Sequence, residues 1–510
     1  MATISTAVGS ERVSRVIGYQ VKAGNFLVST PNLPQSIVVL GEANANNQSG
    51  LDESKKEITS AKEAAELYGS GSPIHQMMRI LRPVTGGGIG GIPTFVIPQA
   101  EAGGGVAAER TITVTGTATS NGSHFVSLNG RTIIDGGSYG FTVLTTDTPT
   151  TIAAKISDAI NGTESSTVIA TPAAGVVTLV SKWKGETSEE LNAAVLTDGK
   201  DLGMTYVVAS TVVGAGTQTV TTSLAKIGSS WNTIVINPYG ESTFAELETY
   251  NGTPDSANPV GRWGAITFKP MIALWGSVLS DKDALVAITN IAARKDQVTN
   301  VLCPAPNSSG YSYEAAANGA LITAPVFQNT PHLSVNGHSY NDMPVPADLN
   351  IGDMAIYDNR DFLVKKGCST VDMVAGKYTF QDFVTTYENG DQNPSWRYVR
   401  SLMQDWNVRY AYFLLEEINV RDHAITSSDQ VTSVVNIIKP KQWVQILNGL
   451  SDDLASRAII VDPDFMKESI VVGVSDVNAD RLDTFFRYKR SGIARIGSTT
   501  AEANFGFGIE

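Results

Sequence analysis

The chain has 510 residues, and at about 150 residues per domain this length excludes one small module and predicts three to four domains. Hydrophobic residues make up 42% of the sequence and charged residues 17%, with 47 glycines and 21 prolines, which indicates a turn-rich globular protein with much β structure. Lys and Arg total 37 against 50 for Asp and Glu, giving a net charge of −13. This charge disfavours a nucleic-acid-binding surface, because phosphate binding needs a positive field.

The N-terminal region and the two cysteines bear on the compartment of the protein. Residues 1–20 hold no continuous apolar run of signal-peptide length, and no part of the chain approaches the roughly 18 apolar residues of a membrane span. We therefore expect a protein that is not secreted and does not insert into a membrane. Cys303 and Cys368 are too few for a disulfide framework or a thiolate metal site, so we expect two reduced structural thiols.

The first regular region, residues 33–100, predicts a β-α-β unit. Residues 37–41 form an apolar run that ends at a glycine, which is typical of a strand buried on both faces. Ser60 begins a capping-box pattern and Ser72 directly precedes a proline, so we expect a helix after each. Residues 94–97 predict the next strand.

Residues 107–213 change character, with Thr-rich alternating runs and several Asn-Gly or Asp-Gly turn signals. We expect an inserted β domain here. The cap and first-turn proline at Thr148 and Pro149 predict one helix within it. Glycine runs at residues 103–105 and 214–216 flank the segment as natural hinges, so we expect an outward, independently folded insertion.

After the insertion the alternation of strands and helices returns, which implies a largely parallel sheet that the insertion interrupts in sequence. Ser280 is the expected cap of one helix. A C-terminal α+β region begins near Val345, and its longest helix is expected over residues 395–417. The expected strands are residues 233–237, 265–273 and 299–303, and the expected helices are residues 244–250, 281–294 and 313–322.

These observations predict a mixed fold class, α/β and α+β multidomain. A split α/β sheet domain carries an inserted all-β domain, a C-terminal α+β domain follows, and extended β arms lie at both ends of the chain. No short-period repeat is present, which disfavours solenoids and propellers. The expected boundaries are an N-terminal arm and linker at 1–32, the α/β domain at 33–104 and 215–344, the insertion at 105–214, the C-terminal inner domain at 345–497 and the C-terminal arm at 498–510.

No constellation in the sequence predicts catalysis, and we predict no enzyme activity, cofactor or metal. Residues 86–91 satisfy G-x-G-x-x-G but lead into a strand, whereas the dinucleotide fingerprint opens a helix. Residues 136–140 satisfy G-x-S-x-G, yet a strand follows, and an Asp-Gly hairpin is the expected structure. The histidines lack the paired spacing of metal sites, and they are His75, His124, His332, His338 and His423.

Both ends of the chain carry β-patterned segments outside the expected domain cores. On an isolated monomer such edges are an aggregation hazard, so donation of each arm to a neighbouring subunit is the favoured interpretation. Pairing of each tail with its own domain is the alternative. The arm residues expected on one face are Val13, Arg15, Ile17, Tyr19 and Val21 at the N-terminus and Phe505, Phe507 and Ile509 at the C-terminus.

A basic cluster precedes the C-terminal arm of this acidic chain. Arg487, Lys489, Arg490 and Arg495 are candidates for electrostatic contacts with an acidic surface of an adjacent subunit or partner. Such complementarity sets register more than affinity. A solvated face is the alternative interpretation of the same residues.

Several short motifs follow one another in a defined order along the chain. The set consists of Leu33 to Gly41, Tyr68 to Pro73 leading into Met77-Met78-Arg79, Trp231 to Gly240, the helix and strand series to Cys303-Pro304, and Arg481-Leu482-Asp483. In this order the motifs resemble the Mu-type contractile tail sheath proteins. The resemblance covers nearly the whole chain apart from the insertion.

The resemblance implies a structural subunit of a contractile phage tail sheath, which polymerises as stacked six-fold rings around an inner tail tube and contracts to drive that tube through the bacterial envelope. It also implies arms that join the C-terminal domains of neighbours in a shared sheet. The insertion would decorate the outside, and the C-terminal region and its basic cluster would face the tube or an adjacent subunit.

The implied partners are further copies of the chain, the inner tube protein, and baseplate and tail terminator proteins, without nucleic acid or membrane insertion. The implied location is the virion tail, and the host cytoplasm during assembly. Two alternatives stay open. Another self-assembling virion or surface-layer protein would share the composition, although a surface-layer protein should carry a signal peptide. A tail-associated hydrolase would need a carboxylate or Ser/His/Asp cluster.

Overall fold

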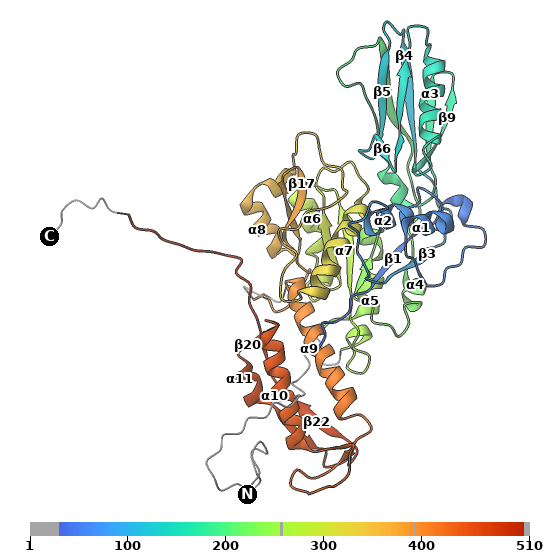
Figure 1. The fold of residues 1–510 in the computed structure, drawn as a ribbon. Helices are drawn as coiled ribbons and strands as arrows, with labels where there is room; N and C mark the ends of the chain where they lie inside the picture. Colours follow the sequence, from blue (N-terminus) through green and yellow to red (C-terminus); the bar gives the residue numbers. More distant parts are fainter. Residues whose placement is uncertain (1–29, 255–258, 389, 392–393, 504–510) are drawn as a thin grey trace, which may run out of the picture. The chain divides into compact units, whose positions relative to one another are not determined.

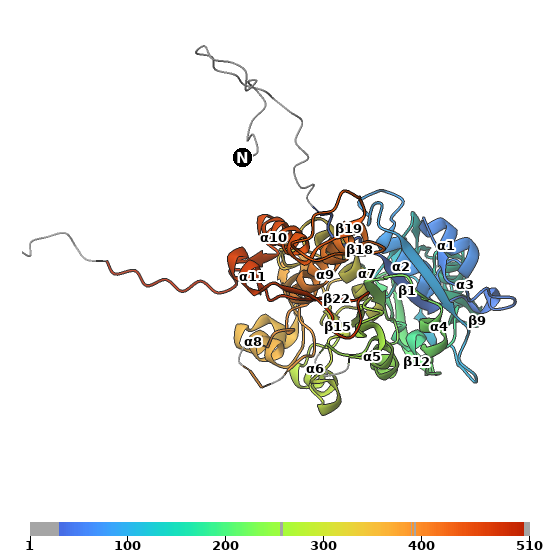
Figure 2. The same cartoon turned by 90° about the horizontal axis from the view of Figure 1, so that it is seen from below.

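The computed structural model describes residues 30–254, 259–388, 390–391 and 394–503 (Figure 1, Figure 2). These residues form two compact units, residues 33–407 with 492–503, and residues 30–32 with 408–491. Within the described ranges, no helix has both the length and the apolar character needed to cross a bilayer. The larger unit holds an α/β sheet and the insertion, and the smaller unit is α+β.

A six-stranded sheet lies at the centre of the larger unit. Its order is β15 (Asn300–Pro304), β14 (Ile272–Ser277), β13 (Ile234–Ile236), β1 (Ile37–Glu42), β3 (Thr94–Gln99) and β2 (Lys56–Glu57). All neighbouring pairs are parallel except β2 with β3. Every residue of β1 is buried, which confirms the strand predicted at residues 37–41.

Helices cover both faces of this sheet, which explains why its parallel strands are buried and largely apolar. Gly41 of β1 lies against Ile74 on one face, and Val38 packs with Leu224 and Leu247 on the other. Ser60 and Ser72 cap the first two helices as predicted. On the first face lie α2 (Pro73–Leu81), with α1 (Ala61–Tyr68) beside it, and α7 (Ser312–Asn329), and on the second α4 (Thr221–Ala225) and α5 (Phe244–Asn251).

The insertion is a β domain with a core of its own, seen at one end of the larger unit in cyan and green (Figure 1). Its first sheet has the order β12 (Met204–Val212), β4 (Glu109–Gly116), β10 (Val176–Ser181) and β9 (Val168–Ala173). Its second has the order β11 (Ala193–Leu196), β5 (Gly122–Leu128) and β8 (Gly140–Val143), and the hairpin β6 (Ile133–Ile134) and β7 (Gly137–Ser138) adjoins them.

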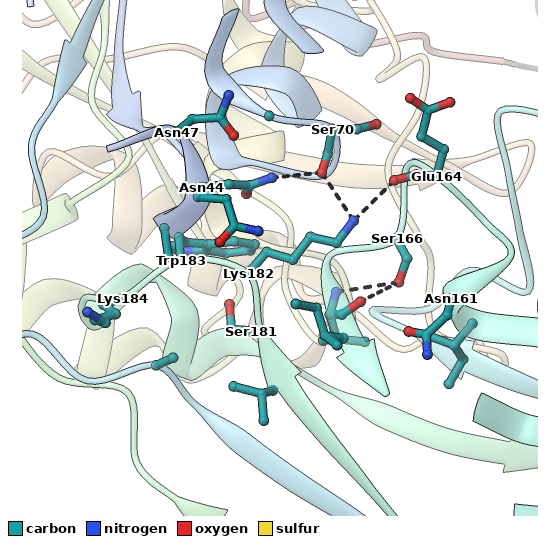
Figure 3. A pocket seen from close by; sticks show the side chains of 18 of the residues that line it. Asn44, Asn47, Ser70, Asn161, Glu164, Ser166, Ser181, Lys182, Trp183 and Lys184 are labelled. Atoms are coloured by element: carbon teal, nitrogen blue, oxygen red, sulfur yellow. Dashed lines mark hydrogen bonds between the residues drawn. The ribbon is translucent and has the colours of Figure 1, made fainter. Parts of the chain in front are cut away.

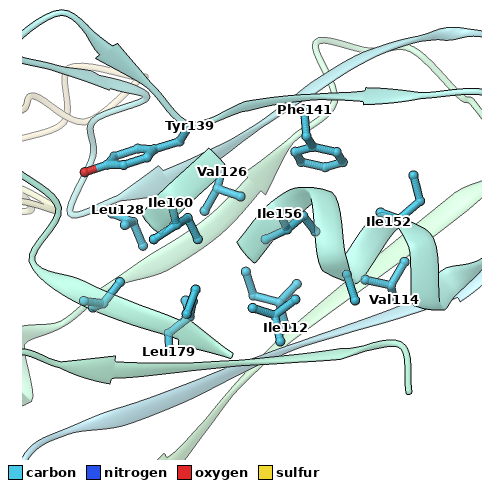
Figure 4. Packing of buried hydrophobic residues seen from close by; sticks show 14 of the residues in the cluster. Ile112, Val114, Val126, Leu128, Tyr139, Phe141, Ile152, Ile156, Ile160 and Leu179 are labelled. Carbon is cyan, nitrogen blue, oxygen red and sulfur yellow. The ribbon is translucent and has the colours of Figure 1, made fainter. Parts of the chain in front are cut away.

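The predicted helix within the insertion is present as α3 (Pro149–Asn161), with Thr148 as its N-cap. Its residues Ile152, Ile156 and Ile160 pack with Ile112 and Phe141 of the two sheets (Figure 4). The two ends of the insertion meet, because Val106 and Ala215 exchange backbone hydrogen bonds of 2.7 and 3.1 Å.

Charged groups fasten the insertion to the sheet domain. Arg131 donates to both carboxylate oxygens of Glu314 at 2.9 Å, and to Asp342 at 3.2 Å. Glu190, in the turn η2 (Glu186–Glu190), accepts the backbone N–H of Ser312 at 2.6 Å and so satisfies a donor at the start of α7. The flanking glycine runs therefore border a docked domain rather than a freely hinged one.

The remaining elements of the larger unit are helices, one hairpin and short turns. They are α6 (Lys282–Thr289), α8 (Tyr357–Lys365), the hairpin β16 (Thr370–Val374) and β17 (Lys377–Asp382), the first turns of α9 (Val399–Asn419), and the 3-10 turns η1 (Ala45–Asn47), η3 (Gly240–Thr243), η4 (Gly261–Trp263), η5 (Ala292–Arg294) and η6 (Gly352–Ala355). The unit boundary falls inside α9, between Asn407 and Val408, and differs from the boundary expected at residue 345. A continuous helix offers no glycine or proline signal at which to place it.

Three local details also differ from the expectation. Asp281 rather than Ser280 caps α6, and its side chain accepts the N–H of Ala284. The expected strand 265–273 begins only at Ile272, since Pro270 supplies no N–H for a ladder. The helix expected over 313–322 continues as α7 to Asn329, past Pro325.

The smaller unit packs helices against short strands around the buried residues Trp443, Leu447, Leu450 and Leu454 of one helix, α10. These side chains recur at helical spacing and share one face. The elements are the later turns of α9, β18 (Ala424–Ile425), β19 (Ile437–Ile438), α10 (Pro440–Ser456), β20 (Ile460–Val461), α11 (Pro463–Ser469), β21 (Val471–Val474), β22 (Leu482–Phe485) and β23 (Lys489–Arg490).

Candidate functional site: open sheet edges in the smaller unit

Each sheet of the smaller unit has only two strands among the residues that the structure describes. β18 pairs with β19 in parallel, while β20 with β23 and β21 with β22 are antiparallel. A two-stranded ribbon is marginally stable and leaves one edge of each strand open to pair with further backbone. These edges are therefore candidate positions for strands from elsewhere.

The β21–β22 hairpin has the most exposed apolar surface of the three. Val471 is 64% exposed and Phe485 is 53% exposed, and the two residues are paired in register across the hairpin. A shallow groove of about 510 Å³ runs over the hairpin and is also lined by Val474 and Val477. An added strand could bury these side chains while its backbone pairs with an open edge.

The N-terminal linker is tied to the same unit where the structure first describes it. Thr30 donates to Asp453 of α10 at 2.6 Å. Arg457, one turn later, donates to Thr30 at 2.7 Å and to Asn32 at 3.0 Å, and its ion pair with Asp453 measures 2.8 Å. Residues 30 and 32 of the linker are thus held against α10 by side-chain hydrogen bonds.

The arm residues predicted from sequence lie outside the described residues, so their strand character stays a prediction. They are Val13, Arg15, Ile17, Tyr19 and Val21 of the N-terminal arm, and Phe505, Phe507 and Ile509 of the C-terminal arm.

Three members of the predicted basic cluster belong to the smaller unit. Lys489 pairs with Asp462 at 2.6 Å, and this hydrogen bond holds the pKa of the Asp462 carboxyl below its usual value. Arg490 lies beside Lys489 in β23. Arg487 is exposed, with its guanidinium 5.5 Å from the ring centroid of Phe485. The cluster therefore lies beside the open hairpin.

Arg495 is different, because it belongs to the larger unit. Its guanidinium donates to Asp382 at 2.6 Å and lies 3.6 Å from the ring centroid of Tyr398, and its side chain is 17% exposed. These contacts are within its own chain. They fasten the segment that leads to the C-terminal arm, whereas the sequence suggested an inter-subunit contact.

The motifs that the sequence analysis set aside have structural roles. Asp135 and Gly136, both with positive φ, form the turn of the β6–β7 hairpin, as predicted for the G-x-S-x-G segment. The following strand β8 pairs with β5 instead of closing that hairpin. Cys303 and Cys368 are buried free thiols. In the described ranges, no three His, Cys, Asp or Glu side chains gather as a metal site.

Sequence reasoning missed the open sheets and the clamp of the linker onto α10. The strands concerned have two to four residues, too short for an alternation pattern to indicate them. The Asp453–Arg457 pair has the i,i+4 spacing of a helix surface pair, a signal that was available in the sequence.

Comparison with known proteins bears directly on the tail sheath resemblance. The chain is 24% identical over 389 residues to the Mu-like prophage FluMu tail sheath protein of Haemophilus influenzae. The aligned region covers 75% of this chain and 74% of that protein. The resemblance to Mu-type tail sheath proteins is confirmed. No family model matches the chain.

Solved sheath structures are also similar to this chain. The sheath tail protein of Desulfitobacterium hafniense aligns over 93% of this chain and 100% of its own, with 12% identity and a TM-score of 0.42. The sheath tail protein of Listeria innocua aligns over 91% and 94%, with 10% identity and a TM-score of 0.41. A contracted sheath complex of an extracellular contractile injection system aligns over 97% and 99%, with 10% identity and a TM-score of 0.40.

Proposed function

We propose that this chain is the structural subunit of a contractile tail sheath, which polymerises helically around an inner tail tube and contracts to drive the tube through the bacterial cell envelope. The observation that carries the proposal is the sequence match to a tail sheath protein over three quarters of the chain. The role is structural rather than enzymatic.

The smaller unit provides a physical route to polymerisation. Its two-stranded sheets gain backbone hydrogen bonds if arms of neighbouring subunits extend them, and the apolar surface of Val471 and Phe485 becomes buried. The arms and their acceptor sheets are different surfaces of one chain. Such a heterologous contact does not close on itself and produces an open helical assembly.

Contraction follows from two arrangements of the same subunits. Strand exchange keeps neighbours connected while the remaining lateral contacts are remade. In this proposal the extended sheath is kinetically trapped and the contracted sheath is lower in free energy. The arms then act as linkers that survive the transition.

The proposed partners are further copies of the chain in six-fold rings, the inner tube protein, and baseplate and tail terminator proteins. The proposed location is the virion tail, with assembly in the host cytoplasm. Arg487, Lys489 and Arg490 are the proposed electrostatic contacts with an adjacent subunit or the tube, whereas Arg495 is a proposed anchor for its own arm.

The test is assembly of the purified chain, alone and with its tube protein, followed by electron microscopy. We expect tubes from the wild type and folded, non-assembling protein from the Val471→Lys and Phe485→Lys variants, since a charge at these exposed positions spares the fold but opposes burial. Val213→Lys is a matched control, because Val213 of the insertion is also 64% exposed. Flat arrays or fibres in place of tubes would favour another self-assembling structural protein. Normal tubes from Val471→Lys would remove the hairpin from the interface.

A further inference from the structure

The segment that leads to the C-terminal arm is held by the larger unit, although it follows the last strand of the smaller unit in sequence. β23 belongs to the smaller unit and residues 492–503 to the larger one. Within residues 492–503 no helix or strand forms, and every residue except Arg495 is exposed. Arg400 donates to the carbonyl of Gly492 at 3.3 Å at the start of the segment, and beyond this point Arg495 makes its contacts with the unit.

Two neighbouring elements of the larger unit form the seat of Arg495. Asp382 is the last residue of β17, and Tyr398 directly precedes α9. A β-bridge between Val384 and Tyr398 places these elements next to each other. The Arg495 guanidinium donates to Asp382 at 2.6 Å and lies 3.6 Å from the ring centroid of Tyr398. An ion pair and a cation–π contact therefore act on the same side chain.

This seat is partly shielded from water. The side chain of Arg495 is 17% exposed and that of Asp382 is 30% exposed. Burial raises the pKa of Asp382, and the neighbouring Arg495 opposes that rise. Partly buried pairs are screened by salt less than exposed pairs are. The contact should therefore persist at physiological ionic strength.

The N-terminal linker is attached to the other unit. Thr30 and Asn32 are held by Asp453 and Arg457 of α10, which belong to the smaller unit. The two ends of the chain are thus fixed to different units. A pull on the N-terminal linker acts on the smaller unit, whereas a pull on the C-terminal segment acts on the larger one.

We propose that Arg495 is the positioning residue of the C-terminal arm, so that the reach of the arm toward a neighbouring copy starts at Arg495 and not at the end of β23. This inference rests on the proposed sheath function, in which the arm pairs with a neighbour. Each residue of extended chain spans about 3.3–3.6 Å, so the starting point decides how far the arm extends. The arm then connects the larger unit of one copy to the acceptor strands of the next.

The attachment itself can be tested on the unassembled full chain with two nitroxide labels, on Gly497→Cys and Lys377→Cys. A Cβ added at Gly497 meets no atom within 4 Å, Lys377 of β17 is exposed, and the native Cys303 and Cys368 are buried. Pulsed electron paramagnetic resonance measures the distance between the labels. We expect a narrow distance distribution with Arg495 present and a broad one in Arg495→Met. Equal widths would overturn the attachment.

The reach of the arm is tested by removing two residues on one side of Arg495 and adding two on the other. Deleting Thr499 and Thr500 shortens the arm by about 7 Å and keeps its predicted alternation. The loss of about two ladder hydrogen bonds should raise the critical concentration for tube formation by about thirtyfold. A Gly-Ser pair added between Ile493 and Ala494 should not change this concentration. It should rescue the deletion only in the Arg495→Met background, where the added length can pass to the arm.

Asp382→Asn removes the charge that faces Arg495 and should repeat the effects of Arg495→Met. Arg421→Met is the matched control, because Arg421 pairs with Glu417 of α9 while its side chain is 63% exposed. It should leave the label distances and the critical concentration at their wild-type values.

Two outcomes of the length experiment would overturn the proposal. One is rescue of the deletion by the added pair while Arg495 is in place, because the reach would then start at β23. The other is the absence of rescue in the Arg495→Met background. A wild-type chain that forms no tubes with its tube protein would contradict the proposed sheath function instead, and the label distances would still decide whether Arg495 holds the segment.

Discussion

The insertion and the smaller unit both contain β-sheets, but they differ in how many strands each sheet has and in how much apolar surface stays exposed. The insertion joins a four-stranded and a three-stranded sheet over α3, and residues from all of these share one buried core. The smaller unit, as far as it is described, has two-stranded sheets only, and its Val471 and Phe485 remain exposed. One module completes its own sheets, while the other leaves edges that further strands can complete.

The ion pairs of the two regions differ in burial in the same way. The insertion is held by buried groups, since the side chain of Glu314 is 1% exposed in its pair with Arg131. The pair between Lys489 and Asp462 in the smaller unit is about half exposed on both sides. Removing one partner of a buried pair is costly, whereas exposed pairs contribute little to stability. Mutations of charged residues should therefore reduce folding stability when they lie at the insertion. In the smaller unit they should mainly affect assembly.

The largest expected effect comes from deleting an arm, residues 1–22 or 498–510. If each arm contributes about five ladder hydrogen bonds at about 1 kcal/mol each, its loss removes several kcal/mol per subunit and abolishes polymerisation. The chain itself should stay folded and soluble. Sedimentation and electron microscopy of each truncated protein measure both properties. Normal tubes formed by a protein that lacks an arm would show that assembly does not require that arm to pair with an open edge of the smaller unit.

The next effect is on stability, in Arg131→Met. This change leaves Glu314 buried without its cation, and we expect a loss of about 3 kcal/mol in the free energy of unfolding, measured by urea denaturation. Burial already raises the pKa of Glu314. Without Arg131 the carboxyl should take up a proton more readily, so the variant should be less impaired at pH 5 than at pH 8.

The double variant Arg131→Met, Glu314→Leu distinguishes the loss of the ion pair from the cost of leaving one buried charge without a partner. Replacing both partners by apolar groups should recover most of the loss, because no unpaired charge remains buried. Lys62→Met is a control within the same unit, since Lys62 pairs with Glu66 on α1 and both side chains are exposed, 83% and 65%. A loss in this control as large as in Arg131→Met would mean that burial is not what makes the docking pair costly to break.

The parts of this comparison that could be predicted from sequence are those with local signals. Ser72 before Pro73 and Thr148 before Pro149 indicated two helix starts that the structure confirms, because a cap and a first-turn proline act within one turn. Pairing over long separations leaves no such local trace. Arg131 and Glu314 are far apart in sequence, and nothing beside either residue marks its partner.

The candidate site was predictable only in outline. Alternation at the chain ends suggested donor strands, but the acceptor strands β20 to β23 are too short to show a period. Arg495 entered the basic cluster by its proximity in sequence, yet tertiary structure places it against Asp382 and Tyr398. A cavity of about 570 Å³, lined by Asn44 of the sheet domain and Lys182 of the insertion (Figure 3), depends on the docking of the insertion, which no local pattern describes.

A pH effect should distinguish the insertion interface further. Glu42, at the end of β1, is fully buried and accepts a hydrogen bond from Thr187 of the insertion at 3.3 Å. Burial is the main cause that raises its pKa to about 8. The folded state therefore keeps a proton that the unfolded state releases above about pH 4.5, so this contribution is full at low pH and is lost as the pH rises through 8.

We expect the ionisation of Glu42 to lower the unfolding free energy of the wild type by roughly 3–4 kcal/mol between pH 5 and pH 8, relative to Glu42→Gln. The amide resembles the protonated acid and does not titrate, so the difference between the two proteins isolates Glu42 from other groups. Urea denaturation at both pH values measures it. A difference that does not change with pH would indicate that Glu42 is ionised throughout the range.

The smallest effect on folding is expected from charge reversal in the smaller unit. Lys489→Glu breaks an exposed pair, so it should change the free energy of unfolding by less than about 1 kcal/mol. Arg490→Glu reverses the neighbouring charge of β23. Assembly should nevertheless slow or lose register, because opposing charges steer neighbours into place. Light scattering and electron microscopy at two salt concentrations measure this, since exposed charges are screened beyond about 3 Å at 1 M salt.

Lys441→Glu provides the control, because Lys441 forms a more exposed pair with Asp429 in the same unit but outside the basic cluster. If only the Lys489 and Arg490 variants are slowed, and 1 M salt removes their difference from the wild type, the cluster acts between subunits. An opposite reversal on the partner surface should then restore part of the rate. Wild-type kinetics and geometry in both variants would instead make the cluster a solvated face, leaving the open strand edges as the assembly surface of this unit.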